Sequence, residues 1–397
     1  MSALEYPVST VPDLLDPNLG MFGKYRLLRR LAAGGMAHVY LASIDGPDGF
    51  SKTCVVKRIL PEYASSSDFN KMFVTEAKVA ALLNHPNIVQ TFDFGKFGEQ
   101  YYLAMEWVAG GSVDTILRQA VKKNVTLGPK TAVLIGIPIL EALSYLESAT
   151  LPDLTPLNLV HRDVTPGNIL VSNIGVVKLT DFGVVKTNAN PGQTVAGVLK
   201  GKYSYMSPEQ ALNKSLDHRS DLFSLGVCLY EIATGRRLFK RESLAATLDA
   251  VTHATVPPPS QSSPDFPVQL ERILMKALTL HREDRYQCAR DMLADLERFR
   301  TTSQWTQSSR ELAALMQGLF PGGIATAIPP GVSSLQSALL PLDRDGTGAS
   351  TVALDPDEDP LPAVDIEDVS PMSARTFALM TGAALAASAV FWWLILR

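Results

Sequence analysis

The segment HRDVTPGN, residues 161–168, holds several chemically active side chains in a stretch that its proline and glycine keep out of regular helix or strand. It places the carboxylate of Asp163 five residues before the carboxamide of Asn168. A second carboxylate, Asp181, lies in VKLTDFG, directly after a predicted strand. Hard oxygen donors at such positions suit Mg²⁺. The pattern predicts a magnesium site built from Asn168 and Asp181, although DFG on its own is also compatible with a simple turn.

A cation and an acid interrupt two apolar patterns nearer the N-terminus. Lys57 lies in TCVVKRIL, a predicted strand in which it points to the same side as Val55. Glu76 lies in the middle of the apolar stripe of the predicted helix SSSDFNKMFVTEAKVAALLNHP. A carboxylate on such a stripe is costly unless a cation meets it, so we expect a buried pair between Lys57 and Glu76. A pair of surface charges is the alternative.

The segment LAAGGMAHVY, residues 31–40, joins the first two predicted strands with small residues. Small side chains let the backbone fold over a ligand and direct its N–H groups at an anion. A tight hairpin also favours glycine, so this segment is weak evidence by itself.

The elements that must position these residues fall into two regions. Short runs rich in β-branched and aromatic residues predict an antiparallel sheet with one inserted helix over residues 24–109. Helices dominate residues 110–300, and two of them, TAVLIGIPILEALSYLESA and SDLFSLGVCLYEIATG, are almost wholly apolar and belong in a core. The predicted fold class is α+β, with a small β-rich lobe and a larger helical lobe. A cleft between the lobes is the expected ligand site.

Taken together and in this order, these pieces match the signature set of protein kinases. Residues 25–299 resemble the eukaryotic-like (Hanks-type) serine/threonine protein kinases of bacteria, through GGMAHVY, VVKRI, HPNIV, HRDVTPGNIL, DFG, YMSPEQ, DLFSLGVCLYEIATG and DRY. The resemblance implies the two-lobed protein kinase fold. It also implies transfer of the γ-phosphoryl group of ATP, with Mg²⁺, to serine or threonine hydroxyls of protein substrates.

The resemblance implies a role for each of the residues above. Lys57 would hold the α and β phosphates of ATP and pair with Glu76, and Asp163 would accept or orient the substrate hydroxyl. Asn168 and Asp181 would hold Mg²⁺. The residues implied to contact the nucleotide are Leu31, Ala32, Gly34, Gly35, Met36, Val39, Val55, Lys57, Met105, Glu106, Val108 and Leu170.

Further positions carried over from the family shape the cleft and its support. Met105 would be the gatekeeper, and residues 106–108 the hinge that meets adenine. Asp221 would brace the loop at 161–168, and Glu209 would pair with Arg285.

Regulation is also implied by the resemblance. Arg162 beside Asp163 marks the class of kinases in which a basic pocket reads a phosphate on the activation segment. Thr194 is the first candidate for that phosphate and Thr187 the second.

The glycine-rich segment departs from the family pattern. Ala32 and Ala37 stand where the family often has its first and third glycines, and only Gly34 of the three remains. Alanine lacks easy access to positive φ, so we expect a working but stiffer lid. Val55 replaces the usual alanine over adenine, which tightens the pocket.

Another departure concerns a cation beside Asp163. Many serine/threonine kinases have lysine at the position of Thr165, where it touches the γ-phosphate, and threonine at the position of Lys202. Here the two residue types are exchanged. We expect Lys202 to reach Asp163 and to supply the missing cation as a catalytic residue. The alternative is a solvated surface lysine in a kinase that works without it.

Composition excludes some functions. The chain has 397 residues, with 36 basic against 40 acidic ones and a net charge of -4, so it lacks the basic field of nucleic-acid-binding proteins. Cys54, Cys228 and Cys288 lie far apart without a CxxC pair, which indicates reduced thiols. The N-terminal extension, residues 1–23, is not a signal peptide, so a cytoplasmic kinase domain is expected.

The C-terminal region is predicted to be a tether. Residues 301–375 read as a flexible linker that is rich in Pro, Gly, Ser and acidic residues, with one short helix near 308–320 that packs on the kinase domain. Residues 376–396 carry no charge and as a helix would span about 31 Å, which is one bilayer core. We therefore expect a single-pass protein of the cell membrane. Signals would arrive through the tether, a partner, or a homodimer formed by the kinase domain or the membrane helix.

Two other functions compete with an active protein kinase. A pseudokinase scaffold would keep the fold and bind partners without catalysis, but it would be expected to lack at least one of Lys57, Asp163, Asn168 and Asp181, and all four are present. A small-molecule kinase on the same fold is disfavoured because YMSPEQ and the loop before it resemble a peptide-docking segment.

Overall fold

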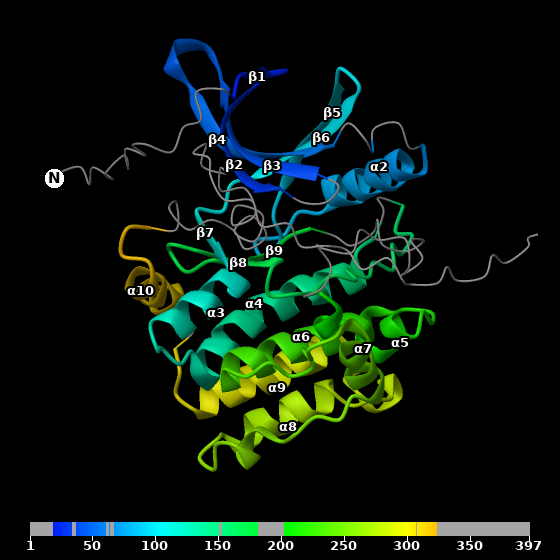
Figure 1. Ribbon diagram of the computed structural model, residues 1–397, viewed down its shortest axis with the longest axis vertical. Helices are drawn as coiled ribbons and strands as arrows, with labels where there is room; N and C mark the ends of the chain where they lie inside the picture. The colour runs from blue at the N-terminus through cyan, green and yellow to red at the C-terminus, as the bar shows by residue number, and fades with distance from the viewer. Residues whose placement is uncertain are drawn as a thin grey trace, which may run out of the picture. The chain divides into compact units, whose positions relative to one another are not determined.

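The structure, a computed structural model of the protein, describes residues 19–33, 37–60, 63, 67–150, 153–181, 202–306 and 308–323. The remainder of the predicted linker and the predicted membrane helix at 376–396 lie outside these residues. The described part has the predicted two lobes, a β-rich lobe above a helical one (Figure 1).

The smaller lobe is an antiparallel sheet with one long helix, α2 (Ser67–Leu82), beside it (Figure 1). Its strand order is β1-β2-β3-β4-β6-β5. The strands are β1 (Met21–Phe22), β2 (Tyr25–Ala33), β3 (Ala37–Asp45), β4 (Ser51–Ile59), β5 (Thr91–Phe97) and β6 (Gln100–Glu106).

Strand β4 lies inside this sheet and carries Lys57. Lys57 pairs with Val39 of β3 on one side and Leu103 of β6 on the other. Alternate residues of β4 belong to separate apolar clusters, Cys54 and Val56 to one and Val55 to the other. The sheet therefore holds Lys57 on the face that carries Val55, as its sequence pattern predicted.

The larger lobe begins with a small sheet and continues as helices. The sheet consists of β7 (Gly110–Ser112), β8 (Ile169–Ser172) and β9 (Val177–Leu179). The helices are α3 (Val113–Lys122), α4 (Gly128–Ser148), α5 (Pro208–Ala211), α6 (His218–Thr234), α7 (Leu244–His253), α8 (Val268–Ala277), α9 (Ala289–Thr302) and α10 (Ser309–Leu319).

Helices α4 and α6 form the centre of the helical lobe, as their apolar sequences predicted. Helix α4 packs on α6 and also on α9. Gly136 of α4 lets the helices approach closely, because a Cβ there would lie 3.0 Å from Leu229 and from Leu296. Within the described residues, α4 alone is long and apolar enough to cross a bilayer, and most of it is buried in this core.

Helix α10 extends the helical lobe past residue 300. Leu312, Met316 and Leu319 are buried against the lobe. Two side chains of the α3 region hold the last turn, since Gln119 Nε2 donates to the Leu319 carbonyl at 3.1 Å and Lys123 Nζ to the Gly318 carbonyl at 2.9 Å. The start of the predicted linker is thus attached to the helical lobe.

Candidate active site

A cleft of about 540 Å³ receives residues from both lobes. Every residue that the sequence assigned to the nucleotide and that the structure describes lines this cleft, whereas residues 34–36 lie outside the described part. The lining members of that set are Leu31, Ala32, Val39, Val55, Lys57, Met105, Glu106, Val108 and Leu170.

Two residues of opposite charge that line the cleft meet each other. Lys57 Nζ lies 3.0 Å from Asp181 Oδ1, although the two residues are 124 positions apart. The charge of Lys57 lowers the pKa of Asp181, so this carboxylate is ionised at neutral pH. The side chain of Glu76 lies outside the described part of α2, so its pairing with Lys57 stays a prediction.

The loop at 161–168 is held together around Asn168. The Asn168 Nδ2 atom donates to the Asp163 carbonyl at 2.9 Å and to Asp163 Oδ2 at 2.7 Å. Thr180 N donates to the Asn168 carbonyl at 2.9 Å, which places the strand end that carries Asp181 beside this loop. Both side-chain hydrogen bonds of Asn168 use its nitrogen, so its amide oxygen stays available to a cation.

Asp221, in the first turn of α6, braces the same loop as predicted. Its carboxylate accepts the backbone N–H groups of His161 at 2.7 Å and of Arg162 at 2.8 Å. Arg162 has φ of 65°, a conformation that non-glycine residues rarely adopt and that these bonds hold in place. Burial raises the pKa of Asp221 to about 7, even though both amide donors favour its ionised form.

The expected contact between Lys202 and Asp163 is present. Lys202 Nζ lies 2.9 Å from Asp163 Oδ2, and it approaches from the residue before the short helix η3 (Tyr203–Tyr205). Burial on its own would lower the pKa of Lys202, but the charge and hydrogen bond of Asp163 outweigh this effect and raise it. Lys202 therefore stays protonated beside the Asp163 carboxylate. Thr165 also lines the cleft.

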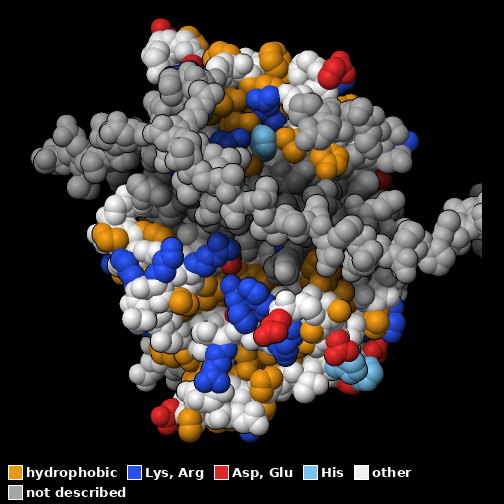
Figure 2. All heavy atoms as spheres, viewed as in Figure 1, with side chains coloured by type: hydrophobic (Ala, Val, Ile, Leu, Met, Phe, Trp, Pro, Cys, Tyr) orange, Lys and Arg blue, Asp and Glu red, His pale blue; other side chains and the backbone are white. Residues whose placement is uncertain are grey.

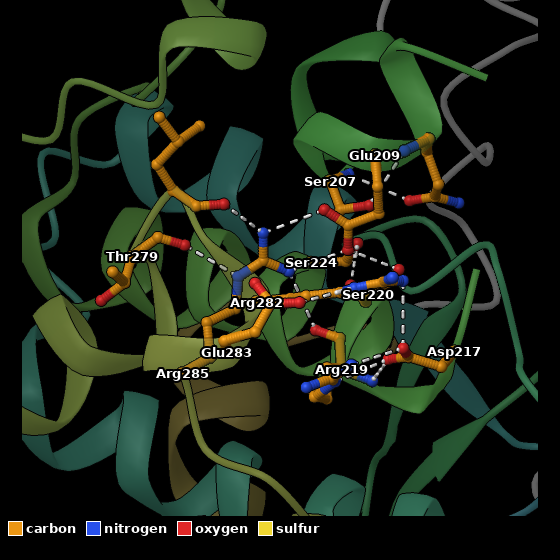
Figure 3. Close-up of polar contacts among 12 residues, drawn as sticks. Ser207, Glu209, Asp217, Arg219, Ser220, Ser224, Thr279, Arg282, Glu283 and Arg285 are labelled. Atoms are coloured by element: carbon orange, nitrogen blue, oxygen red, sulfur yellow. Dashed lines mark hydrogen bonds and ion pairs between the residues drawn. The ribbon is translucent and has the colours of Figure 1, made fainter. Parts of the chain in front are cut away.

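A buried ion pair anchors the segment that follows Lys202 to the helical lobe, and Figure 3 shows it. Arg285 donates through Nη1 to Glu209 Oε1 at 2.8 Å and through Nη2 to Glu209 Oε2 at 2.9 Å, which confirms the predicted pairing. Ser220 donates to Glu209 as well, at 2.6 Å. Burial alone would raise the pKa of Glu209, but the bonds from Arg285 and Ser220 lower it.

Several polar residues that line the cleft were missed by the sequence analysis. They come from α3 and from the segment after α6, and they are Asp114, Arg118, Arg237 and Lys240. The one signal for them was the basic run GRRLFKR, residues 235–241, directly after an apolar helix. Nothing in its spacing connects this run with α3.

The donor set suits a nucleotide held through Mg²⁺. Among the described residues no group of three or more His, Cys, Asp or Glu side chains gathers as a metal site. One carboxylate and one amide oxygen, from Asp181 and Asn168, fit Mg²⁺ better than a full protein cage would, because this ion commonly keeps phosphate oxygens and waters as its other ligands.

The candidate phosphosites Thr194 and Thr187 lie outside the described residues, and the role of Arg162 stays a prediction.

Comparison with known proteins agrees with this geometry. The chain is 40% identical over 317 residues to the tyrosine-protein kinase MasK of Myxococcus xanthus. This match covers 79% of this chain and 49% of that protein. The serine/threonine-protein kinase PrkC of Bacillus subtilis is 34% identical over 275 residues, or 69% of this chain and 40% of that protein. The matched regions thus span half or less of these relatives.

The solved structures give the same fold. The PknI kinase domain of Mycobacterium tuberculosis superimposes with a TM-score of 0.52 and 25% identity, covering 70% of this chain and 98% of that one. The family model for the protein kinase domain matches residues 25–314. The chain therefore belongs to the protein kinase domain family.

Proposed function

We propose that this protein is an active kinase that uses ATP and Mg²⁺ to phosphorylate serine and threonine hydroxyls of protein substrates. One observation carries the proposal: Lys57, Asn168 and Asp181, from three separate segments, line one cleft between two lobes, and Asp163 hydrogen-bonds Asn168 beside it. Such an arrangement positions a nucleotide and an acceptor hydroxyl and neutralises phosphate charge, which is what phosphoryl transfer needs.

Each residue has a physical task in this proposal. Asp163 accepts the proton of the acceptor hydroxyl as that oxygen bonds to the γ-phosphorus and the bond to the β–γ bridging oxygen breaks. Lys57, which lies 3.0 Å from Asp181, offsets charge on the nucleotide phosphates. Asn168 and Asp181 hold Mg²⁺, which when bound neutralises charge on the phosphate oxygens. Lys202 adds a cation beside Asp163.

The acceptor residue is proposed from the relatives. Several of them carry the name serine/threonine-protein kinase, whereas MasK is named a tyrosine-protein kinase. Phosphoamino acid analysis of the labelled products decides between the two: phosphoserine and phosphothreonine are expected, and phosphotyrosine alone would contradict the proposal.

The decisive test compares wild type with Asp163→Asn, using labelled ATP, Mg²⁺ and a mixture of unstructured proteins. The variant should lose transfer by about 10³-fold or more while it still binds nucleotide. Asp265→Asn is the matched control, because Asp265 is exposed and does not line the cleft. Nucleotide binding without transfer by the wild type would instead support the pseudokinase alternative.

Membrane attachment is a separate part of the proposal. It rests on the uncharged stretch 376–396, and it places the kinase domain at the cytoplasmic face of the cell membrane. Fractionation of cells that express the full chain should recover it with membranes, and deletion of residues 376–397 should release an active kinase. Recovery of the full chain in the soluble fraction would overturn attachment and leave the catalytic proposal untouched.

A further inference from the structure

Three cations line the cleft together with the loop at 161–168, called the catalytic loop below. Arg118 of α3 and Arg237, which follows α6, share the carboxylate of Asp114: Arg118 Nη2 lies 2.8 Å from its Oδ2, and Arg237 Nη2 lies 3.5 Å from its Oδ1. Lys240 lines the same cleft and is exposed. We call Arg118, Arg237 and Lys240 the basic floor.

The basic floor is attached to the catalytic residues by short connections. The Asp114 N–H donates to the Pro166 carbonyl at 2.9 Å, inside the loop that carries Asp163. Arg237 also hydrogen-bonds Tyr205, the last residue of η3, whose N–H donates to the Lys202 carbonyl at 3.1 Å. A peptide that presents its hydroxyl to Asp163 must therefore pass close to these cations.

The charge balance of the cleft opposes that of the whole chain. Among the described residues that line it, six are Lys or Arg and three are Asp or Glu, whereas the chain carries a net charge of -4. ATP phosphates account for a cation such as Lys57, but the basic floor comes from helical-lobe elements that are not assigned to the nucleotide. It therefore presents a separate positive surface to a second, anionic ligand.

Structural support alone does not account for these charges. One carboxylate, Asp114, serves two arginines, and the side chains of Arg118 and Arg237 remain 50% and 40% exposed. Arg237 also pairs with the buried Glu231 at 2.8 Å, and its own side chain stays partly exposed beside that pair. Lys240 has no acidic partner within the described part of the chain. Lys and Arg side chains gather on this face of the helical lobe in Figure 2.

We propose that the basic floor selects protein substrates with carboxylate side chains next to the acceptor hydroxyl, so that this kinase phosphorylates acidic segments. This inference rests on the proposed function and deepens it. The exposed guanidinium and ammonium groups pair with aspartate or glutamate of the bound segment, while a lysine there meets three like charges.

The test uses a set of acceptor peptides that differ by one residue beside the hydroxyl: glutamine, glutamate, lysine or phosphoserine. Wild-type kcat/KM should be about fivefold higher for the best glutamate peptide than for its glutamine counterpart, and lower again for lysine. Transfer to the glutamine peptide reports the proposed kinase activity itself. If no peptide is phosphorylated, the kinase proposal has failed, and if all are phosphorylated equally, only this inference has.

The variant Arg118→Gln/Lys240→Gln should bring the glutamate-to-glutamine ratio close to one, and Lys240→Glu should shift preference toward the lysine peptide. Arg237 is left intact because its removal would take the ion-pair partner from the buried Glu231 and could destabilise the fold. The control Arg272→Gln/Lys214→Gln removes the same charge from exposed positions outside the cleft and should keep the ratio.

Two results would overturn the inference. A glutamate preference that survives in Arg118→Gln/Lys240→Gln as fully as in the control would show that other groups recognise the acid. A gain from phosphoserine with none from glutamate would replace carboxylate recognition by phosphate recognition.

Discussion

Lys202 and Asp163, 39 residues apart in the sequence, meet with Lys202 Nζ 2.9 Å from Asp163 Oδ2. The catalytic loop carries Thr165 where many kinases carry a lysine, so a cation beside Asp163 arrives here from a different segment. If Lys202 supplies the charge, activity depends on the order of the segment that delivers it.

Replacing Lys202 by alanine is expected to lower kcat about 10²-fold, because a cation close to the developing phosphate charge is lost. Nucleotide affinity should change less than about threefold, since the contacts of Lys57 remain. Steady-state kinetics and fluorescence titration with a nucleotide analogue measure the two effects. Lys214→Ala is the control, because Lys214 is exposed and does not line the cleft.

The exchange of residue types also allows a rescue experiment. In Thr165→Lys/Lys202→Thr the cation returns to the catalytic loop, so the double variant should recover most of the activity that Lys202→Ala loses. If Lys202→Ala keeps the activity of the wild type, Lys202 is a dispensable surface lysine, and the hypothesis that it supplies a catalytic cation is wrong.

Asp181→Asn is expected to weaken the Mg²⁺ dependence of nucleotide binding. Affinity measured with Mg²⁺ should fall at least about tenfold, the loss that even an outer-shell partner of a metal produces. Affinity measured in chelator should stay constant or rise, because a negative charge near the phosphates is removed. Calorimetry in both conditions checks this, with Asp265→Asn as control. If Mg²⁺ strengthens nucleotide binding to Asp181→Asn as much as to the wild type, Asp181 is not a ligand of Mg²⁺.

Glu209→Gln should lower the free energy of unfolding by about 3–5 kcal/mol, because Arg285 would keep a buried charge without its partner. The pKa of Glu209 is lowered in the folded protein, so its contribution is fully present above the unfolded-state pKa and is lost as pH falls through the folded-state value. The difference in the free energy of unfolding between wild type and variant should therefore become smaller below about pH 4.5.

Urea unfolding at several pH values between about 7 and 3 measures this difference in the free energy of unfolding. The control Glu283→Gln removes an exposed acid of the same region and should change stability little. A gap that is constant with pH would mean that the Glu209 carboxylate does not titrate as described.

Gly175→Ala should detach α10. Gly175 has φ of +80°, and a Cβ there would lie 1.8 Å from the carbonyl oxygen of Ser309, the first residue of α10. The strained backbone conformation at residue 175 and the steric overlap with Ser309 both oppose the substitution. Hydrogen exchange of the backbone amides in α10 should therefore become much faster. Gly98→Ala is the matched control, since Gly98 has φ of +57° with open space around it. Equal exchange of α10 in both variants would contradict the close approach.

Much of the fold and cleft followed from local pattern. Alternation along β4 placed Lys57 on the face of Val55, and unbroken apolar runs marked α4 and α6 as core helices. The order of the kinase motifs then named the residues that line the cleft. These features are readable because each depends on a short stretch of chain, where side-chain periodicity and backbone geometry are set by neighbouring residues.

The basic floor and the docking of α10 depended on tertiary structure. Arg237 and Arg118 meet at Asp114 only because the turn after α6 lies against the start of α3. Likewise, the need for glycine at position 175 arises from Ser309, far along the chain. No sequence spacing encodes such contacts, since they are decided by how rigid helices pack once the core has formed. The sequence by itself determined the two lobes and predicted the residues that line the cleft, and the packing of the helices decided which other charges surround those residues.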